Sequence, residues 1–479
     1  MLARTYSYSV IGGLARQNKD LERTMNKTVV IDVVGLSSSV IGEYTPFLKE
    51  YIARKNMVNI EPVLPAVTTS VQSTYLTGQW PSGTGIVGNG WYDHTDCEIK
   101  FWKQSNKLVA GEKIWEKAKK QDPTFTCATM FWWYNMYSTA DYAVTPRPNY
   151  LADGRKMPDC YSQPAELRDM LQEKLGQFPL FQFWGPGANI KSTQWIADAS
   201  MITDELYDPT LTLIYLPHLD YCLQKFGPDF SMIHNELKEI DDVVKKLVLH
   251  YEGKGARVLI LSEYGISPVN NPIHINRIFR EHDLLNIRIE RGLELLDPGA
   301  SKAFVVSDHQ IAHVYFNDKS VEDEVRTFLV NVPGIELVLN KEEQKTYHID
   351  HERSGDLVLI ADKDSWFTYY FWLDDAKAPD YARCVDIHKK PGYDPVEMFM
   401  SSKLRAGYKL LKKKAGFRYV MDVIPLDASL VKGSHGRIGV ERKYQPVLIS
   451  DMRFKSDLLP PTEIFKTIWS VMTSETIGQ

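Results

Sequence analysis

The sequence predicts an α/β fold: a doubly wound, mostly parallel sheet with helices on both faces, and an inserted α+β cap domain. Three stretches, 28–34, 211–216 and 257–261, are almost continuously apolar, as in the central strands of parallel sheets. Amphipathic helical patterns lie between these stretches, and alternating strands and helices form a sheet that is covered on both sides. With 479 residues, the chain is also long enough for a second domain.

The helices are predicted from the spacing of apolar residues. One helix begins at Pro46 and places Phe47, Leu48 and Tyr51 on one face. A longer helix is predicted within 233–248, where apolar residues recur every three or four positions.

The stretch from 300 to 420 differs from the rest, because short alternating strands at 312–316 and 357–360 accompany an aromatic cluster at 366–372. It is interpreted as the cap, and 419–425 and 446–450 are predicted to return to the main sheet. The predicted organisation is a leader (1–27), the first part of the core (28–299), the cap (300–420) and the C-terminal part of the core (421–479).

Composition excludes some functions. The formal net charge of −5 does not favour a nucleic acid polymer as partner. The basic run 409–414 is interpreted as a solvated helix face. No apolar run approaches the roughly 18 residues of a membrane span. Five scattered cysteines without a CxxC pattern favour a reducing compartment, and hence a cytoplasmic location. The acid-poor N-terminal segment leaves organelle targeting open, and the oligomeric state is undetermined.

Asp32 is the first candidate for chemistry. It interrupts an apolar strand, and a buried carboxylate is costly unless it is paired or binds a metal. Asp32 is therefore a candidate metal ligand, although a salt-bridged or helix-capping Asp would show the same pattern.

A dense motif follows. Pro65 precedes Thr68 by three residues, and then come Thr77-Gly78, Pro81, Gly85-Ile86 and Asn89, in that order. This pattern resembles the type I phosphodiesterase/nucleotide pyrophosphatase branch of the alkaline phosphatase superfamily, to which phosphonoacetate hydrolase is closely related. The resemblance implies that Thr68 is the nucleophile and that Asn89 binds substrate.

A threonine hydroxyl is a poor nucleophile at neutral pH, but a metal that stabilises the alkoxide makes it competent. A helix N-terminus after Thr68 would add partial positive charge for the phosphoryl oxygens. The alternative is that Thr68 and Thr69 are ordinary β-branched strand residues. Trp91 and Tyr92 could stack on a substrate ring or pack in the core.

The resemblance also locates metal ligands. Asp220, followed by Gly227-Pro228, matches the family Asp, and Gln224 stands where the family has a histidine. Residues four apart share a helix face, so both could reach one metal. His218 is a possible substitute ligand, but its offset differs from that of the family histidine, so it is interpreted as a histidine that packs or supports the ligands.

Glu263 and Tyr264 stand where the family has Asp-His, and His435 lies in the C-terminal Gly-x-His-Gly. A competing segment, Ser307-Asp308-His309-Gln310, matches the letters of Asp-His better but lacks the following glycine. It remains an alternative source of ligands.

The predicted site has two halves. Asp32, Thr68, Glu263 and Tyr264 would hold one metal, and Asp220, Gln224 and His435 the other. Oxygen-rich ligands favour Mn, Mg or Fe, so two divalent or trivalent ions are expected, not both zinc. A Tyr264 phenolate would suit a ferric ion.

The predicted function is hydrolysis of phosphodiester, pyrophosphate or phosphonate bonds in a small phosphorylated or phosphonate substrate, with a phosphomonoesterase left open. The alternative is a degenerate, non-catalytic member that binds a phosphorylated ligand or partner. In the cap, Lys389 and Lys390 could meet an anionic substrate group, and Asp386 and His388 could bind substrate or instead join the metal shell. A solvated loop is equally compatible with this segment.

Overall fold

The computed structural model describes residues 25–474 of the chain. The predicted leader therefore lies almost entirely outside the described residues. Within the described part, no helix combines the length and the apolar character that crossing a lipid bilayer requires.

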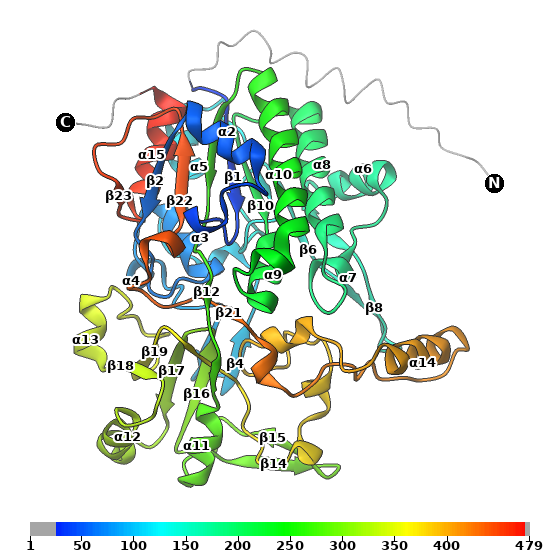
Figure 1. Cartoon of the computed structure of the whole chain (residues 1–479), viewed down its shortest axis with the longest axis vertical. Coiled ribbons are helices and arrows are strands. Elements are labelled where there is room, and N and C mark those ends of the chain that lie inside the picture. The colour runs from blue at the N-terminus through cyan, green and yellow to red at the C-terminus, as the bar shows by residue number, and fades with distance from the viewer. Residues whose placement is uncertain (1–24, 475–479) are drawn as a thin grey trace.

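A nine-stranded sheet forms the centre of the larger domain (Figure 1). Across the sheet, the strands are β23 (Leu458–Leu459), β2 (Asn56–Ile60), β22 (Val447–Ser450), β11 (Arg257–Leu261), β1 (Thr28–Val33), β10 (Leu211–Leu216), β5 (Cys127–Met130), β6 (Tyr142–Pro146) and β9 (Cys160–Gln163). The five strands from β11 to β6 are mutually parallel, whereas β22 and β9 run antiparallel to their neighbours β11 and β6.

Helices cover both faces of this sheet. On one face, α10 (Phe230–Gly253) packs between α2 (Pro46–Arg54) and α8 (Ile190–Tyr207). On the other, α3 (Thr68–Thr77) packs against α15 (Glu463–Thr473). The predicted α/β fold with a large, mostly parallel sheet is confirmed, and the three apolar stretches are its central strands β1, β10 and β11.

A second, antiparallel sheet lies below the first in Figure 1. Its strands, in spatial order, are β16 (Ala303–Asp308), β17 (Ile311–Phe316), β19 (Leu357–Ala361) and β18 (Ile335–Leu339). The aromatic cluster at 366–372 is buried in the separate hydrophobic core beside this sheet. The chain enters this part after β12 (Ser267–Pro268) and leaves it through β21 (Gly433–Ser434), and these two strands pair. That pairing returns His435 to the main domain.

The segment 419–425 forms no strand, so its predicted return to the main sheet is wrong. Val423 and Ile424 are buried in the second core instead. The apolar residues of this segment pack in that core, and the chain rejoins the main sheet later, at β22.

The remaining elements, apart from short 3-10 turns, are α4 (Pro81–Thr84), β3 (Gly90–Asp93), β4 (Glu98–Phe101), α5 (Ile114–Gln121), β7 (Asn149–Tyr150), β8 (Lys156–Met157), α6 (Ala165–Leu175), α7 (Leu180–Phe183), α9 (His218–Phe226), β13 (Asn271–Ile273), α11 (Ile275–Glu281), β14 (Ile287–Glu290), β15 (Leu293–Leu296), α12 (Glu322–Leu329), α13 (Lys341–Thr346), β20 (Ser365–Phe367) and α14 (Lys403–Lys414).

Candidate active site

The predicted site residues meet at one edge of the main sheet. Asp32 lies near the end of β1, Asp220 lies in the first turn of α9 after β10, and Glu263 and Tyr264 follow β11. Because these three strands are parallel neighbours, their carboxyl ends lie together, which is where open α/β sheets build their sites.

Thr68 is the first residue of α3, and only 4% of its surface is exposed. Its Oγ1 lies 3.1 Å from the hydroxyl oxygen of Tyr264. The N-terminus of a helix carries partial positive charge, so an anionic group that reached Thr68 would be stabilised there.

Asp32 and Glu263 form a buried carboxylate pair beside Thr68. Gln72, one turn further along α3, donates from Nε2 to Glu263 Oε1 at 2.6 Å and to Asp32 Oδ2 at 3.4 Å. The other oxygens, Asp32 Oδ1 and Glu263 Oε2, are buried without a hydrogen-bond partner. Burial and the neighbouring Glu263 raise the pKa of Asp32, and burial raises the pKa of Glu263.

Asp220 is at the centre of the other half. It accepts hydrogen bonds from Gln224 Nε2 at 2.8 Å and from the Tyr264 hydroxyl at 3.2 Å. Burial raises the pKa of Asp220 to about 7. Gln224 is itself held, because its Oε1 accepts a hydrogen bond from the Tyr393 hydroxyl at 3.0 Å. The polar groups of this half are therefore largely paired with one another.

His435 faces Asp220 with an unpaired nitrogen. Its Nδ1 lies 2.7 Å from the carbonyl oxygen of Ala66, which can only accept, so we assign the ring proton to Nδ1. Burial lowers the pKa of His435, which favours the neutral ring. Nε2 then presents a lone pair 3.6 Å from Asp220 Oδ1 and has no hydrogen-bond partner.

Tyr264 separates the two halves. Its ring stacks on His435 with centroids 3.6 Å apart and an interplanar angle of 7°. Burial and the carboxylates of Asp220 and Glu263 raise the pKa of Tyr264, so the neutral phenol is favoured. The Tyr264 hydroxyl donates to Asp220 and lies within hydrogen-bond distance of Thr68 Oγ1, so it links the two residues. Its role as a metal ligand stays a prediction.

The tip of the β16–β17 hairpin reaches the same place. His309, with φ of 62°, forms the tight turn, and its ring lies 3.9 Å from His435 and 3.6 Å from Tyr393 between centroids. The backbone N–H of Gln310 donates to the His435 carbonyl at 2.9 Å. The competing Asp-His segment thus contacts His435. Its contribution of metal ligands stays a prediction.

Asp308 is occupied by other partners. It accepts from the backbone N–H of Asn89 at 2.7 Å and from Asn89 Nδ2 at 3.1 Å, and it lies 2.7 Å from His309 Nδ1. Asn89 in turn accepts from the Thr69 hydroxyl at 3.0 Å. Asn89 therefore contacts Thr69, the residue that follows the predicted nucleophile Thr68. Asp308, which belongs to the second domain, holds Asn89 in place.

The segment 386–389 is a surface turn. His388 and Lys389 are exposed, and Asp386 is half-buried with an oxygen 3.4 Å from Lys389 Nζ. Lys390 is buried between Asp394 and Glu397, 2.7 Å from an oxygen of each. The structure thus leaves Asp386, His388 and Lys389 outside the buried cluster and pairs Lys390 internally.

The buried oxygen and nitrogen atoms of the site could coordinate a cation. Two carboxylate oxygens and one imidazole nitrogen, on Asp32, Glu263 and His435, are buried acceptors without a proton donor. Such acceptors are costly unless a proton or a metal satisfies them. The oxygens of Asp32, Glu263 and Thr68 suit a hard divalent ion, and His435 with Asp220 offers a second, smaller set.

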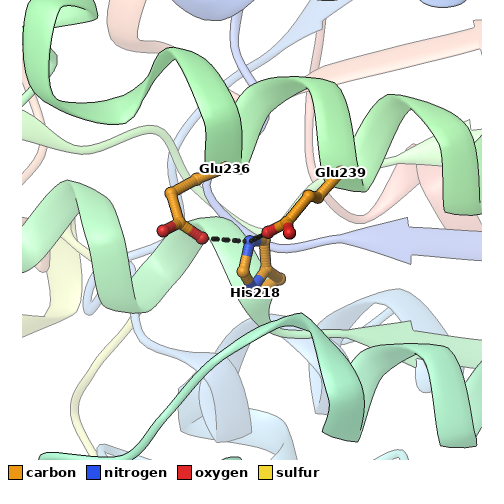
Figure 2. Close-up of side chains that lie close together, drawn as sticks. All are labelled: His218, Glu236 and Glu239. Atoms are coloured by element: carbon orange, nitrogen blue, oxygen red, sulfur yellow. Dashed lines mark ion pairs between the residues drawn. The ribbon is translucent and has the colours of Figure 1, made fainter.

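A different group of three possible ligands lies nearby. Among the described residues, one set of three His, Cys, Asp or Glu residues brings its ligand atoms within 4.8 Å of one another: His218, Glu236 and Glu239. Figure 2 shows His218 pointing toward Glu236 and Glu239 of α10, with Nε2 2.7 Å from Glu236 Oε2 and 3.8 Å from Glu239 Oε2. These contacts join the start of α9 to α10.

Sequence reasoning missed Gln72 and Tyr393. Gln72 lies four residues after Thr68, and that helical spacing could have indicated that it faces the site. Tyr393 comes from a distant irregular segment, and no local pattern predicts its contact with Gln224.

Known proteins resemble this chain at two levels. A sequence model described as type I phosphodiesterase/nucleotide pyrophosphatase matches residues 28–394. An uncharacterized pyrophosphatase/phosphodiesterase of Schizosaccharomyces pombe is 23% identical over 298 residues, which cover 58% of this chain and 52% of that protein. The aligned region thus spans about half the length of this curated relative.

Two solved structures share the fold. Phosphonoacetate hydrolase of Sinorhizobium meliloti, in complex with phosphonoformate, superposes with a TM-score of 0.57 at 14% identity, covering 93% of this chain and 95% of that chain. An inactive variant of murine ectonucleotide pyrophosphatase/phosphodiesterase 5, in complex with AMP, gives 0.56 at 12% identity, covering 95% and 96%.

Proposed function

Because the chain belongs to the type I phosphodiesterase/nucleotide pyrophosphatase family of phosphoric-ester hydrolases, we propose that it hydrolyses phosphodiester, pyrophosphate or phosphonate bonds with Thr68 as nucleophile. One observation carries the proposal: Asp32 and Glu263 present unpaired, buried oxygens beside a threonine at a helix N-terminus. Carboxylates arranged in this way hold a cation, and a cation makes a threonine hydroxyl reactive.

Each residue has a proposed role. Asp32, Glu263 and Thr68 would hold one metal ion, and Asp220 and His435, with Gln224, a second one. When bound, the ions would supply positive charge that stabilises the Thr68 alkoxide and the phosphoryl oxygens. Glu263, whose Oε2 is buried without a hydrogen-bond partner, would accept the hydroxyl proton. The Tyr264 hydroxyl orients Thr68 Oγ1, and Asn89 would bind a phosphoryl oxygen.

The reaction would run in two steps. Thr68 Oγ1 attacks phosphorus, the bond to the leaving group breaks, and the phosphoryl group is attached to Thr68. Water then cleaves the bond between Thr68 and phosphorus, which restores the hydroxyl. The substrate would be a small phosphorylated or phosphonate compound, by analogy with the ligands in the similar structures.

The ligand types set the metal preference. The two halves contain a single histidine among oxygen donors, so we propose Mn, Mg or Fe, with zinc in at most one half. Two tightly held zinc ions per chain, measured by elemental analysis of protein purified without chelators, would contradict this. The five cysteines all lie within the described residues and are free, which supports a reducing compartment.

The test compares bis-p-nitrophenyl phosphate with p-nitrophenyl phosphate in the presence of Mn, Fe, Mg or Zn. Thr68→Ala should abolish metal-dependent turnover. Thr77→Ala is the matched control, because Thr77 is buried on the same helix but bonds the Ser73 carbonyl. Turnover that survives in Thr68→Ala would contradict the nucleophile.

A second candidate is binding of a phosphorylated ligand without turnover. The observation that favours it is the closed centre, where the Tyr264 ring stacks on His435 and Thr68 is 4% exposed. Calorimetric binding of AMP that needs Asn89, with no Thr68-dependent turnover under any metal, would support this candidate over hydrolysis.

A further inference from the structure

Helix α14 differs from the other long helices because none of its residues is buried. It has 12 residues, all exposed or half-buried. Figure 1 shows it projecting from the side of the second domain, away from both sheets. Isolated helices shorter than about 12–15 residues are marginal in water, and proteins normally stabilise them by burying an apolar face. The apolar face of α14 is unburied.

That face is a defined stripe. Leu404, Tyr408 and Leu411 follow the spacing i, i+4, i+7, which places them on one side of the helix. They are 87%, 56% and 67% exposed, respectively. Phe417, 67% exposed, and Val420, 53% exposed, extend the apolar surface beyond the end of the helix.

The charge around the stripe has one sign. Between Ser401 and Met421 the chain has seven basic residues and no Asp or Glu. They are Lys403, Arg405, Lys409, Lys412, Lys413, Lys414 and Arg418. Arg405 and Lys409 are ion-paired with Asp422, which fixes one side of the helix to the returning chain. The other five carry net positive charge along the flanks and the C-terminal end of the stripe.

We propose that α14 binds the surface of a membrane that contains anionic lipids. The helix lies flat, with Leu404, Tyr408 and Leu411 at the boundary between headgroups and acyl chains. The lysines on the flanks extend toward the lipid phosphates while their stems cover apolar surface. A nucleic acid backbone would match the charge but leave the apolar stripe in water. The lack of Asp and Glu between Ser401 and Met421 matches a uniformly anionic surface.

The first experiment is co-sedimentation of the full chain with vesicles. Vesicles of equal parts phosphatidylcholine and phosphatidylglycerol should bind at least about tenfold more tightly than pure phosphatidylcholine vesicles. Raising the salt from about 0.1 M to about 1 M should weaken that binding, because the Debye length falls from about 10 Å to about 3 Å. Equal, weak sedimentation with both vesicles would overturn the proposal and leave the stripe as a surface for a protein.

Variants separate the two contributions. Leu404→Ser with Leu411→Ser should remove binding although every positive charge remains. Lys412→Gln, Lys413→Gln and Lys414→Gln together should remove the preference for anionic vesicles. Leu249→Ser is the matched control, since Leu249 is 57% exposed on α10 in the other domain. Unchanged binding in the double serine variant would overturn the proposal.

A direct readout locates the contact. In Leu411→Trp, the added fluorescence should shift to the blue when anionic vesicles are added, because the indole leaves water. The shift is measured as a difference from the unsubstituted chain, which has other tryptophans. Binding without this shift would mean that another surface contacts the membrane, and would overturn the assignment to α14.

Discussion

The two halves of the candidate site both lie at the carboxyl ends of neighbouring strands of the main sheet. Their polar side chains differ in how many hydrogen-bond partners they have. In the half formed by Asp32 and Glu263, each carboxylate keeps one buried oxygen without a partner. In the other half, Asp220 accepts from both Gln224 and Tyr264, and Gln224 is held by Tyr393. A bound cation would therefore stabilise the first half more, because its buried carboxylate oxygens lack hydrogen-bond donors. In the second half, hydrogen bonds already offset much of the cost of burying Asp220.

The largest expected effect is on catalysis. Asp32→Asn should lower kcat/KM by roughly 1000-fold, because it removes a charge that we propose binds a metal beside the proposed nucleophile Thr68. Gln224→Leu should cost only about tenfold, because an amide that supports Asp220 tunes the site without carrying its charge. Steady-state kinetics with the preferred metal measures both, and equal losses would contradict the asymmetry.

A second prediction concerns the pH dependence of the chelated protein. Asp220 has a folded pKa of about 7, above the unfolded value of about 3.9. The folded state therefore binds the proton more tightly, and the stability that Asp220 contributes is present below about pH 4 and is lost as the pH rises to 7.

In Asp220→Asn the side chain is neutral at every pH, so this dependence of the free energy of unfolding on pH is removed. The free energy of unfolding of the variant, relative to that of wild type, should rise by about 1–3 kcal/mol between pH 4 and pH 7. Urea unfolding in excess chelator measures this difference. A constant difference across this range would contradict the raised pKa.

A third prediction tests the unpaired oxygens through stability. In metal-free protein, Asp32→Asn should raise the free energy of unfolding by about 1–2 kcal/mol, since it removes the repulsion between Asp32 and Glu263. Adding Mn²⁺ should raise the Tm of wild type and leave that of the variant nearly unchanged. The same metal-induced shift in both proteins would place the ion elsewhere.

The smallest expected effect is that of Tyr393→Phe. It removes the hydrogen bond to Gln224 Oε1 and leaves a buried acceptor without a partner, which costs about 1 kcal/mol or slightly more. Activity should stay within about threefold of wild type, since Tyr393 supports Gln224 and no reacting group. A loss as large as that of Asp32→Asn would show that the second domain controls the chemistry.

The sequence by itself determined the fold of the main sheet and the place of most candidate-site residues at its edge. The strands β1, β10 and β11 were predicted because a strand buried on both faces must be apolar throughout, which is a local signal. The positions of Asp32, Asp220 and Glu263 follow, because the ends of parallel neighbouring strands coincide. The motif around Thr68 then indicated the proposed nucleophile, which lies at the start of α3.

Only the tertiary structure decided how these side chains are satisfied. Tyr393 on Gln224, Asp308 on Asn89 and His309 on His435 join segments more than a hundred residues apart, and no sequence period encodes such contacts. The same limit explains the wrong assignment of 419–425, where an apolar stretch fits either of two cores equally well by pattern. Which core it joins depends on the space left by the rest of the chain, and packing is a property of the whole fold.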